Sequence, residues 1–164
     1  MALSDAMFTA TSALTVTGLT VVTTSTAFSL LGQIVLLILI QIGGVGYMFI
    51  VVLALVVLGR RISLLDRLAL SNSLGLSRPT DIVRILRRTF LGILVVEGLG
   101  AVALYVYWQR SGIVPAENGP LYALFHAVSA FCNAGFDLFV GLARYPEGLP
   151  GDSGTLLIMG LLIF

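Results

Sequence analysis

The sequence is poor in charged residues and contains no lysine. Charged side chains make up 10% of its 164 residues, whereas ordinary soluble domains carry about 25%. No charged residue occurs between Asp5 and Arg60. So few charges could not cover the surface of a soluble domain of this size. The composition therefore predicts an all-α integral membrane protein.

The sequence also lacks the marks of several other protein classes. Cys132 is the single cysteine, so no disulfide framework within the chain is indicated. The net charge of +1 gives no case for nucleic-acid binding. No phosphate-binding loop, metal-ligand motif or nucleophile elbow is present, so we expect neither an enzyme nor a bound cofactor. Because the chain begins almost directly with one apolar segment and stops inside another, we expect it to be a piece of a longer protein.

Long apolar runs predict membrane spans. The first is expected over residues 30–59. Its apolar run, Leu30–Leu58, would form a helix about 43 Å long, which exceeds the roughly 30 Å hydrocarbon core. The second is expected over residues 89–109; it contains one acid, Glu97, and ends in a cluster of aromatic residues typical of a membrane interface. A third is expected to start at residues 153–164 and is cut short there.

The arginines predict how these spans are oriented. Seven of the nine lie in residues 60–88, and the other two lie in the segments 110–120 and 141–152. By the positive-inside rule, residues 60–88 are expected to be a cytoplasmic linker and the two other segments to be external loops. Parts of the linker, residues 62–70 and 82–88, could form amphipathic helices on the membrane surface. A solvated charged loop is the alternative.

Two further apolar segments are too short to cross a membrane. Residues 5–14 and 121–131 would form helices of about half the membrane thickness. Given the orientation of the neighbouring spans, each must enter from the outside and return to the outside. Non-helical backbone at membrane depth persists only where protein or a water-filled cavity satisfies its polar groups. We therefore predict two re-entrant segments, each a short helix with a return loop, within residues 1–29 and 121–140.

The two short segments resemble each other. Aligning Asp5–Val22 with Tyr122–Phe139 gives identical residues, which are Ala6/Ala123, Phe8/Phe125, Ala10/Ala127, Ser12/Ser129, Ala13/Ala130 and Gly18/Gly135. The shared glycine follows the predicted end of the helix in both copies. The chain thus reads as about one and a half copies of a unit made of span, half-helix, return loop and span. Functional sites of repeated membrane proteins commonly lie between the repeats.

Such a unit suits a cation. The C-terminal end of a half-helix entering from outside points its carbonyl groups, with their partial negative charge, towards the membrane centre. Gly18 and Gly135 allow the following backbone to turn its carbonyl groups towards an axis. Rings of such carbonyls replace the hydration shell of potassium in channel filters. Without charged ligands, the site favours a large monovalent ion over Mg²⁺ or Ca²⁺.

The stretches TATSALTVTGLTVV, LLGQIVLLILIQIGGVGYMF and FHAVSAFCNAGFDLF resemble the Trk/Ktr/HKT superfamily of potassium transporters over essentially the whole chain. The resemblance implies a multi-pass protein of the cell (inner) membrane with four such units around one pore, of which about one and a half are present here. It implies a homodimer with a cytoplasmic nucleotide-binding regulatory subunit, and transported K⁺. The filter residues that it implies are Val16, Thr17, Gly18, Leu19, Asn133, Ala134, Gly135 and Phe136.

Several polar residues and glycines leave two interpretations open. Glu97 could be a coupling site for Na⁺ or H⁺, or could hydrogen-bond a neighbouring unit. Asp137 could attract cations at an outer mouth or be a solvated loop acid. His126 is expected to be a packed neutral side chain rather than a metal ligand. Gly43, Gly44 and Gly46 could form a hinge or allow close helix packing.

Two other functions compete with potassium uptake. A secondary transporter with broken helices could carry an anionic substrate, but such sites aim helix N-termini at the anion, whereas here the C-termini point inwards. A membrane scaffold would not need the duplicated glycine, and an intramembrane enzyme would need paired catalytic groups.

Overall fold

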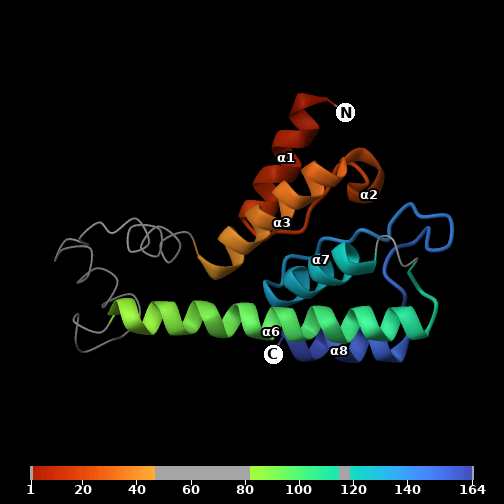
Figure 1. The fold of residues 1–164 in the computed structure, drawn as a ribbon. Coiled ribbons are helices and arrows are strands. Elements are labelled where there is room, and N and C mark those ends of the chain that lie inside the picture. Colours follow the sequence, from red (N-terminus) through yellow and green to blue (C-terminus); the bar gives the residue numbers. More distant parts are fainter. Residues whose placement is uncertain (1, 47–81, 115–118, 164) are drawn as a thin grey trace. The chain divides into compact units, whose positions relative to one another are not determined.

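The structure is a computed structural model that describes residues 2–46, 82–114 and 119–163 (Figure 1). This part of the chain is mostly helical, as predicted. Its helices are α1 (Leu3–Leu14), α2 (Thr24–Ala27), α3 (Leu30–Val45), α6 (Ile82–Arg110), α7 (Gly119–Phe131) and α8 (Ser153–Ile163). Residues 1–44 and 96–164 form one compact unit, which holds the candidate site, and residues 45–95 form another.

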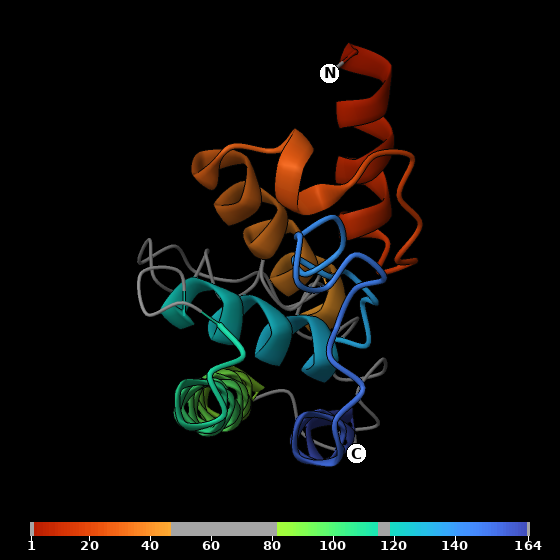
Figure 2. The ribbon, with the colours of Figure 1, turned by 90° about the vertical axis from the view of Figure 1, so that its right-hand side faces the viewer.

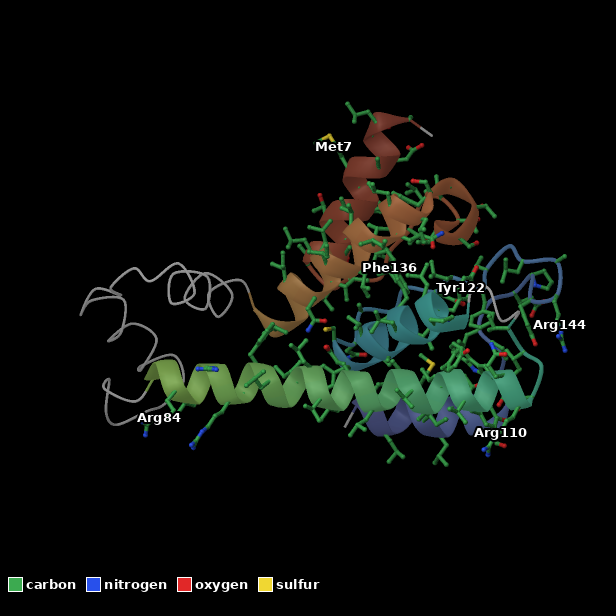
Figure 3. The ribbon with its side chains drawn as sticks, viewed as in Figure 1. Met7, Arg84, Arg110, Tyr122, Phe136 and Arg144 are labelled. Atoms are coloured by element: carbon green, nitrogen blue, oxygen red, sulfur yellow. The ribbon has the colours of Figure 1, made fainter. Side chains whose placement is uncertain are left out.

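The longest described helix is α6, with 29 residues. Its stretch Arg87–Arg110, 24 residues, is long and apolar enough to cross a membrane. Arg84 and Arg110 lie near its two ends (Figure 3). The helix begins at Ile82, upstream of the predicted span, and therefore includes the segment 82–88 for which an amphipathic helix or a loop was open. Neither proline nor glycine interrupts the sequence there, so nothing in the local backbone ends the helix.

The surface of α6 explains why the helix suits lipid. Its exposed large apolar side chains are Ile85, Leu91, Leu94, Val95, Val96, Leu99, Val102 and Val106. Moving apolar side chains from water into hydrocarbon lowers the free energy. The exposed apolar side chains of α6 therefore agree with a membrane location for this helix.

Helix α3 begins at Leu30, the first residue of its apolar run, and is described as far as Val45. The rest of the span expected over residues 30–59, most of the predicted linker and the segment 62–70 lie outside the described residues. Helix α8 begins at Ser153, and Asp152 precedes it. The Asp152 carboxylate accepts a hydrogen bond from the Thr155 N–H, at 3.0 Å, as expected of a helix N-cap.

Two side-chain bonds join α8 to the C-terminal half of α6. The Tyr107 hydroxyl donates to Asp152 Oδ2 at 2.6 Å, and the Trp108 indole N–H donates to the Thr155 hydroxyl at 2.8 Å. Trp108 and Thr155 are fully buried. A buried indole N–H normally has a partner because leaving it unpaired costs free energy. The two bonds therefore fix the rotation of α8 against α6.

Helix α7 lies against α6 and α8 and supplies more residues to the core than any other described helix (Figures 1 and 2). The side chains of Phe125 and His126 are almost completely buried. The aromatic ring of Trp108 meets the rings of His126 and Phe139 edge-on, with centroids 5.5 and 5.1 Å apart. Such edge-to-face pairs add stabilisation beyond the buried area. The segment around α7 is therefore a rigid support for the loop that follows it.

Helix α1 is less covered than α7. Phe8 is 44% exposed, whereas Phe125, its counterpart in the sequence alignment, is 0% exposed. Met7 points away from the body of α1 (Figure 3) and is also exposed. Helices α6 and α8 both pack around α7, whereas the end of α1, at Leu14, lies against Gly43 of α3. The two copies therefore differ in their surroundings.

Candidate functional site

The first return loop, residues 15–22, starts with a left-handed helix cap. The Ser12 carbonyl accepts a hydrogen bond from the Thr17 N–H at 3.0 Å, and the Ala13 carbonyl accepts one from the Val16 N–H at 3.3 Å. Val16 has φ of 55°. This combination is the Schellman motif, which satisfies carbonyl groups at the end of a helix. It turns the chain sharply as α1 ends.

The second return loop, residues 132–139, starts in the same way. The Ser129 carbonyl accepts a hydrogen bond from the Ala134 N–H at 2.7 Å, and the Ala130 carbonyl accepts one from the Asn133 N–H at 3.0 Å. Asn133 has φ of 54°. These donors and acceptors stand at the positions that the sequence alignment pairs with those of the first loop.

The glycines continue the correspondence. Gly18 has φ of 73° and Gly135 has φ of 72°. Both values lie in the left-handed region that glycine enters without penalty. Each loop thus passes through two left-handed residues, separated by one other residue. The local backbone of the two loops is the same at these positions, although only the glycine is identical in sequence.

The sequence indicated the turns at the glycines but not those at Val16 and Asn133. Asparagine is enriched among non-glycine residues with positive φ, so Asn133 carried a signal that could have been used. Valine is branched at Cβ, and the left-handed conformation costs such a residue roughly 1–2 kcal/mol. Such strain persists only where the surroundings impose it, and it gathers at functional sites. The positive φ of Val16 therefore indicates that the surroundings of the first loop override the backbone preference of valine.

The two loops touch at their glycines. A β-carbon built on Gly18 would lie 2.6 Å from the Ala134 carbonyl oxygen and 3.3 Å from the Gly135 Cα. A small cavity of about 100 Å³ lies beside this contact and is lined by both glycines, by three threonines and by Asp137. The structure thus brings the glycines of the two predicted re-entrant segments together, at the ends of α1 and α7.

Helix α3 packs behind both loops through two glycines. A β-carbon on Gly43 would collide with the Leu14 carbonyl oxygen and lie 2.8 Å from Val16 Cγ2. A β-carbon on Gly44 would collide with the Cys132 side chain. Of the two interpretations open from the sequence, close packing accounts for Gly43 and Gly44. It does not account for Gly46, which has φ of 89° and where a β-carbon would meet no described atom within 4 Å. The same pair of small residues therefore fits α3 against the end of each half-helix.

Serines brace the loops in different ways. The Ser129 hydroxyl donates to the Phe136 carbonyl at 2.9 Å and accepts from the Phe136 N–H at 3.0 Å. The Ser12 hydroxyl instead contacts the Thr17 hydroxyl at 2.9 Å. The partners of Ser129 belong to the backbone of the loop, so its role is structural. The residues after the glycines also differ, since Leu19 is 63% exposed and Phe136 is 3% exposed.

Asp137 makes several hydrogen bonds within the protein. Its Oδ1 atom accepts from the Phe139 N–H at 2.6 Å and lies 3.0 Å from His126 Nε2. Its Oδ2 atom accepts from the Leu149 N–H at 2.6 Å. The carboxylate is half-buried beside the cavity of the glycine pair. It therefore ties α7, the second return loop and the following segment together, which neither interpretation from the sequence included.

Glu97 lies between three elements. It is 2% exposed, and its Oε1 atom accepts a hydrogen bond from the Gln41 side-chain amide of α3 at 3.0 Å. The Cys132 thiol, at the end of α7, lies 3.9 Å from the same oxygen. Glu97 thus joins α6 to α3 near the start of the second return loop, as the hydrogen-bonding interpretation expects.

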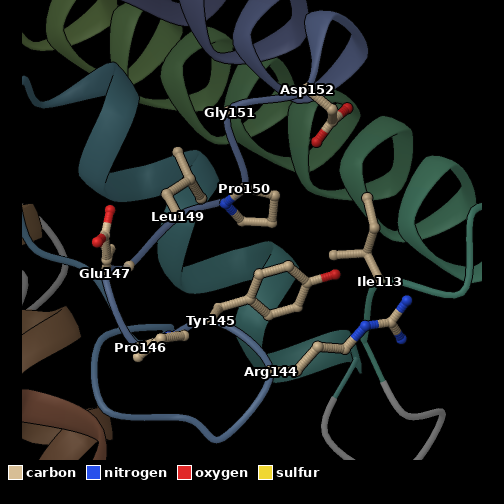
Figure 4. Close-up of a pocket in the computed structure, with 10 residues that line it drawn as sticks. Ile113, Arg144, Tyr145, Pro146, Glu147, Leu149, Pro150, Gly151 and Asp152 are labelled. Carbon is tan, nitrogen blue, oxygen red and sulfur yellow. The ribbon is translucent and has the colours of Figure 1, made fainter.

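A larger pocket, of about 540 Å³, lies away from the glycine pair (Figure 4). It is formed by the segment before α8 together with Ile113. Arg144 stands beside it, donates a hydrogen bond to the Gly112 carbonyl and lies over the Tyr145 ring. These contacts join the segments 110–120 and 141–152, both predicted to be external. The pocket holds none of the predicted filter residues.

Comparison with known proteins identifies the family. The family model described as TrkH, cation transport protein, matches residues 1–140. The chain belongs to the TrkH family of cation transport proteins. The resemblance seen in the sequence is confirmed, and this TrkH-family chain is accordingly a membrane protein.

Three curated relatives of this TrkH-family chain are similar over most of its length. Ktr system potassium uptake protein B of Vibrio alginolyticus is 42% identical over 139 residues, which are 85% of this chain and 30% of that protein. Potassium/sodium uptake protein NtpJ of Enterococcus hirae is 39% identical, over 82% of this chain and 29% of that protein. Ktr system potassium uptake protein B of Bacillus subtilis is 41% identical, over 82% of this chain and 30% of that protein. The chain therefore spans about three tenths of the length of these relatives.

Proposed function

We propose that this chain forms part of the ion path of a larger potassium-uptake subunit in the cell (inner) membrane. The observation that carries the proposal is the pair of return loops, which share their backbone conformation and touch at Gly18 and Gly135. The names of the relatives, which are potassium or potassium/sodium uptake proteins, support K⁺ as the transported ion. Transport rather than an enzymatic reaction fits the same names.

The proposed filter is lined by backbone carbonyl groups of the two return loops. Its residues are Val16, Thr17, Gly18 and Leu19 in the first loop and Asn133, Ala134, Gly135 and Phe136 in the second. Carbonyl oxygens carry partial charge without formal charge, which suits a monovalent ion that gives up its water easily. Helices α1 and α7 both end at the loops, so the negative ends of their dipoles add to this preference for cations.

Both loops are proposed to face the outside of the cell, and residues 60–88 to face the cytoplasm. On this proposal the chain contributes two of four filter loops and about one and a half of four units. The support is the share of the relatives' length that the chain spans, about three tenths. The remaining units complete the pore, and a homodimer with a cytoplasmic nucleotide-binding regulatory subunit forms the assembly.

Glu97 is proposed to act as a structural link and not as a binding site for a coupling ion such as Na⁺ or H⁺. The support is its burial and its bond to Gln41 on α3. A buried acid with a good hydrogen-bond partner stabilises the packing of the helices that it joins.

Rubidium uptake tests the proposed function directly. The full-length protein that contains these 164 residues is expressed in a bacterial strain unable to take up potassium. We expect it to restore growth at low potassium and to take up Rb⁺. We further expect purified residues 1–164 alone, in lipid vesicles, to conduct no Rb⁺, because two of the four loops are present. Failure of the full-length protein to take up Rb⁺, with the protein present in the membrane, would contradict the proposal.

A further inference from the structure

A narrow groove lies between α6 and α8, apart from the glycine pair. Its volume is about 240 Å³, and its lining includes Leu99, Gly100 and Ala103 of α6 and Leu161 and Leu162 of α8. The two helices approach closely at its floor, where a β-carbon on Gly100 would lie 2.6 Å from Leu162 Cδ2. Its edges, Leu99 and Leu161, are 66% and 71% exposed. The groove is therefore closed at its floor and open along its length.

The chemistry of the groove fits hydrocarbon. Every residue that lines it is apolar or glycine, and it opens on the membrane-spanning stretch Arg87–Arg110 of α6. Water does not fill such a crevice because it would find no hydrogen-bond partners there. A helix with its side chains is about 10–12 Å across, whereas an acyl chain is thin and flexible enough to follow the floor. The shape of the groove therefore favours an acyl chain as its occupant.

Arg110 lies on the same face of α6 as the groove. It follows Ala103 by seven residues and Val96 by fourteen, spacings that place side chains on one face of a helix. Figure 3 shows its side chain at the end of α6, on the side away from α7. The side chain is exposed and has neither a hydrogen bond nor an ion pair in the described part of the chain. It therefore presents a positive charge without a partner at one end of the groove.

The distances along α6 match the depth of one membrane leaflet. At about 1.5 Å per residue, the lining residues Ala103 to Val96 lie about 10 to about 21 Å along the helix from Arg110. One leaflet with its headgroup region is about 20–22 Å thick, which is half of a bilayer. A lipid headgroup beside Arg110 would therefore place an acyl chain along the groove, with its end near the membrane centre.

We propose that the groove between α6 and α8 binds an acyl chain of an anionic phospholipid whose phosphate group pairs with Arg110. The guanidinium group of arginine donates several hydrogen bonds to phosphate, and basic side chains near the membrane surface attract anionic lipids. One molecule thus accounts for both the apolar groove and the charge at its end. An apolar helix in the groove would leave Arg110 without a partner. The inference rests on the membrane location of the chain and not on the proposed ion path.

The chain offers matched variants for both parts of this site. Ala103→Phe fills the groove, whereas Val102→Phe places the same ring on the neighbouring residue, which is exposed and does not line the groove. Arg110→Gln removes the charge, and Arg110→Lys retains it. Arg84→Gln removes an exposed charge near the other end of α6 (Figure 3). Each change at the site therefore has a control on the same helix.

Native mass spectrometry measures lipid binding by the full-length protein in detergent, with phosphatidylglycerol or with phosphatidylcholine of the same acyl chains. We expect the wild type to bind phosphatidylglycerol about fivefold more tightly, the factor for one basic side chain near an anionic lipid. Arg110→Gln should retain one phosphatidylglycerol molecule fewer than the wild type, whereas Arg110→Lys and Arg84→Gln should retain the same number. Ala103→Phe should also lose one bound lipid, and Val102→Phe should follow the wild type.

A density map of the full-length protein in phosphatidylglycerol nanodiscs identifies the occupant. We expect an elongated density in the groove that is continuous with a headgroup beside Arg110. A helix of the same polypeptide in the groove, a second copy of the chain there, or an empty groove would each overturn the inference.

The binding measurements can overturn it independently. Equal binding of the two lipids by the wild type would do so, even if no variant folds. Folded Arg110→Gln and Ala103→Phe proteins that bind as much phosphatidylglycerol as the wild type would do the same. None of these results depends on Rb⁺ uptake, so a failure of this inference and a failure of the proposed function can be told apart.

Discussion

Gly18 and Ala134 approach so closely that no side chain fits between them. A β-carbon on Gly18 would lie 2.6 Å from the Ala134 carbonyl oxygen, which belongs to the other return loop. These residues are far apart in the sequence and end two different half-helices. The contact therefore makes the glycine a requirement of the meeting of the two loops, in addition to its own positive φ.

Gly43→Ala should destabilise the protein because the new methyl group collides with the Leu14 carbonyl oxygen and presses on Val16. Overpacking of this kind costs typically about 1–3 kcal/mol. The expected result is a lower Tm of the purified full-length protein in detergent, measured against wild type.

Gly160→Ala is the control for this substitution. Gly160 lies in α8, and a β-carbon there would meet no atom within 4 Å. Alanine favours the helix over glycine by up to about 1 kcal/mol, so this variant should equal or exceed the wild-type Tm. A Gly43→Ala protein as stable as Gly160→Ala would contradict the close packing of α3 on the first return loop.

Asp152→Ala should loosen the start of α8. The aspartate caps the Thr155 N–H and accepts the Tyr107 hydroxyl. Loss of an N-cap costs about 1 kcal/mol. Asp152→Asn is the matched control, because asparagine caps helices about as well and retains an acceptor for Tyr107. Hydrogen–deuterium exchange of the α8 amides should increase in the alanine variant only, and equal exchange in both variants would rule out the capping role.

The same cap should depend on pH. Burial raises the pKa of Asp152, but the hydrogen bonds from Tyr107 and Thr155 lower it by more, so its pKa lies below the ordinary value. A carboxyl group with a lowered pKa stabilises the folded state above its unfolded pKa, near 4, and this stabilisation is lost as pH falls further. Wild-type Tm should therefore drop more than that of Asp152→Asn between pH of about 5 and about 3. Parallel curves for the two proteins would contradict the assignment.

The helical character of the chain could be read from the sequence, since apolar runs and short apolar segments follow the period and length of helices. The cap residues Val16 and Asn133 could not be read so easily, because a valine in the left-handed conformation contradicts its local preference. The bond between Asp137 and Leu149 was also missed. This bond depends on how the segment after the second return loop folds back towards Asp137, and no local sequence pattern predicts that path.

The alignment of the two copies also did not predict how exposed their side chains are. Phe8 and Phe125 are identical and aligned, yet one is 44% and the other 0% exposed. Burial depends on which neighbouring helices pack around each copy, and a pairwise match of residues contains no information on neighbours. Matching sequence thus indicated matching backbone but not matching environment.

Glu97→Gln should preserve transport if Glu97 is a structural link. Glutamine keeps an oxygen that can accept from the Gln41 amide, whereas Glu97→Leu leaves that half-buried amide without this partner, which lowers stability. We expect Rb⁺ uptake and its dependence on Na⁺ and pH to be near wild type in Glu97→Gln, and the Tm to fall in Glu97→Leu. Loss of Na⁺ or pH dependence in Glu97→Gln alone would instead identify a coupling site.

The most direct test of the filter is Rb⁺ uptake by cells that express the full-length protein with Gly18→Ser, compared with wild type and with Gly98→Ala. Gly98 lies in α6, where a β-carbon would meet nothing within 4 Å, so Gly98→Ala controls for loss of a glycine. With protein levels matched, we predict that Gly18→Ser loses Rb⁺ uptake or its preference over Na⁺, while Gly98→Ala retains both. Equal Rb⁺ uptake and equal preference for Rb⁺ over Na⁺ in wild type and Gly18→Ser would contradict a filter at Gly18.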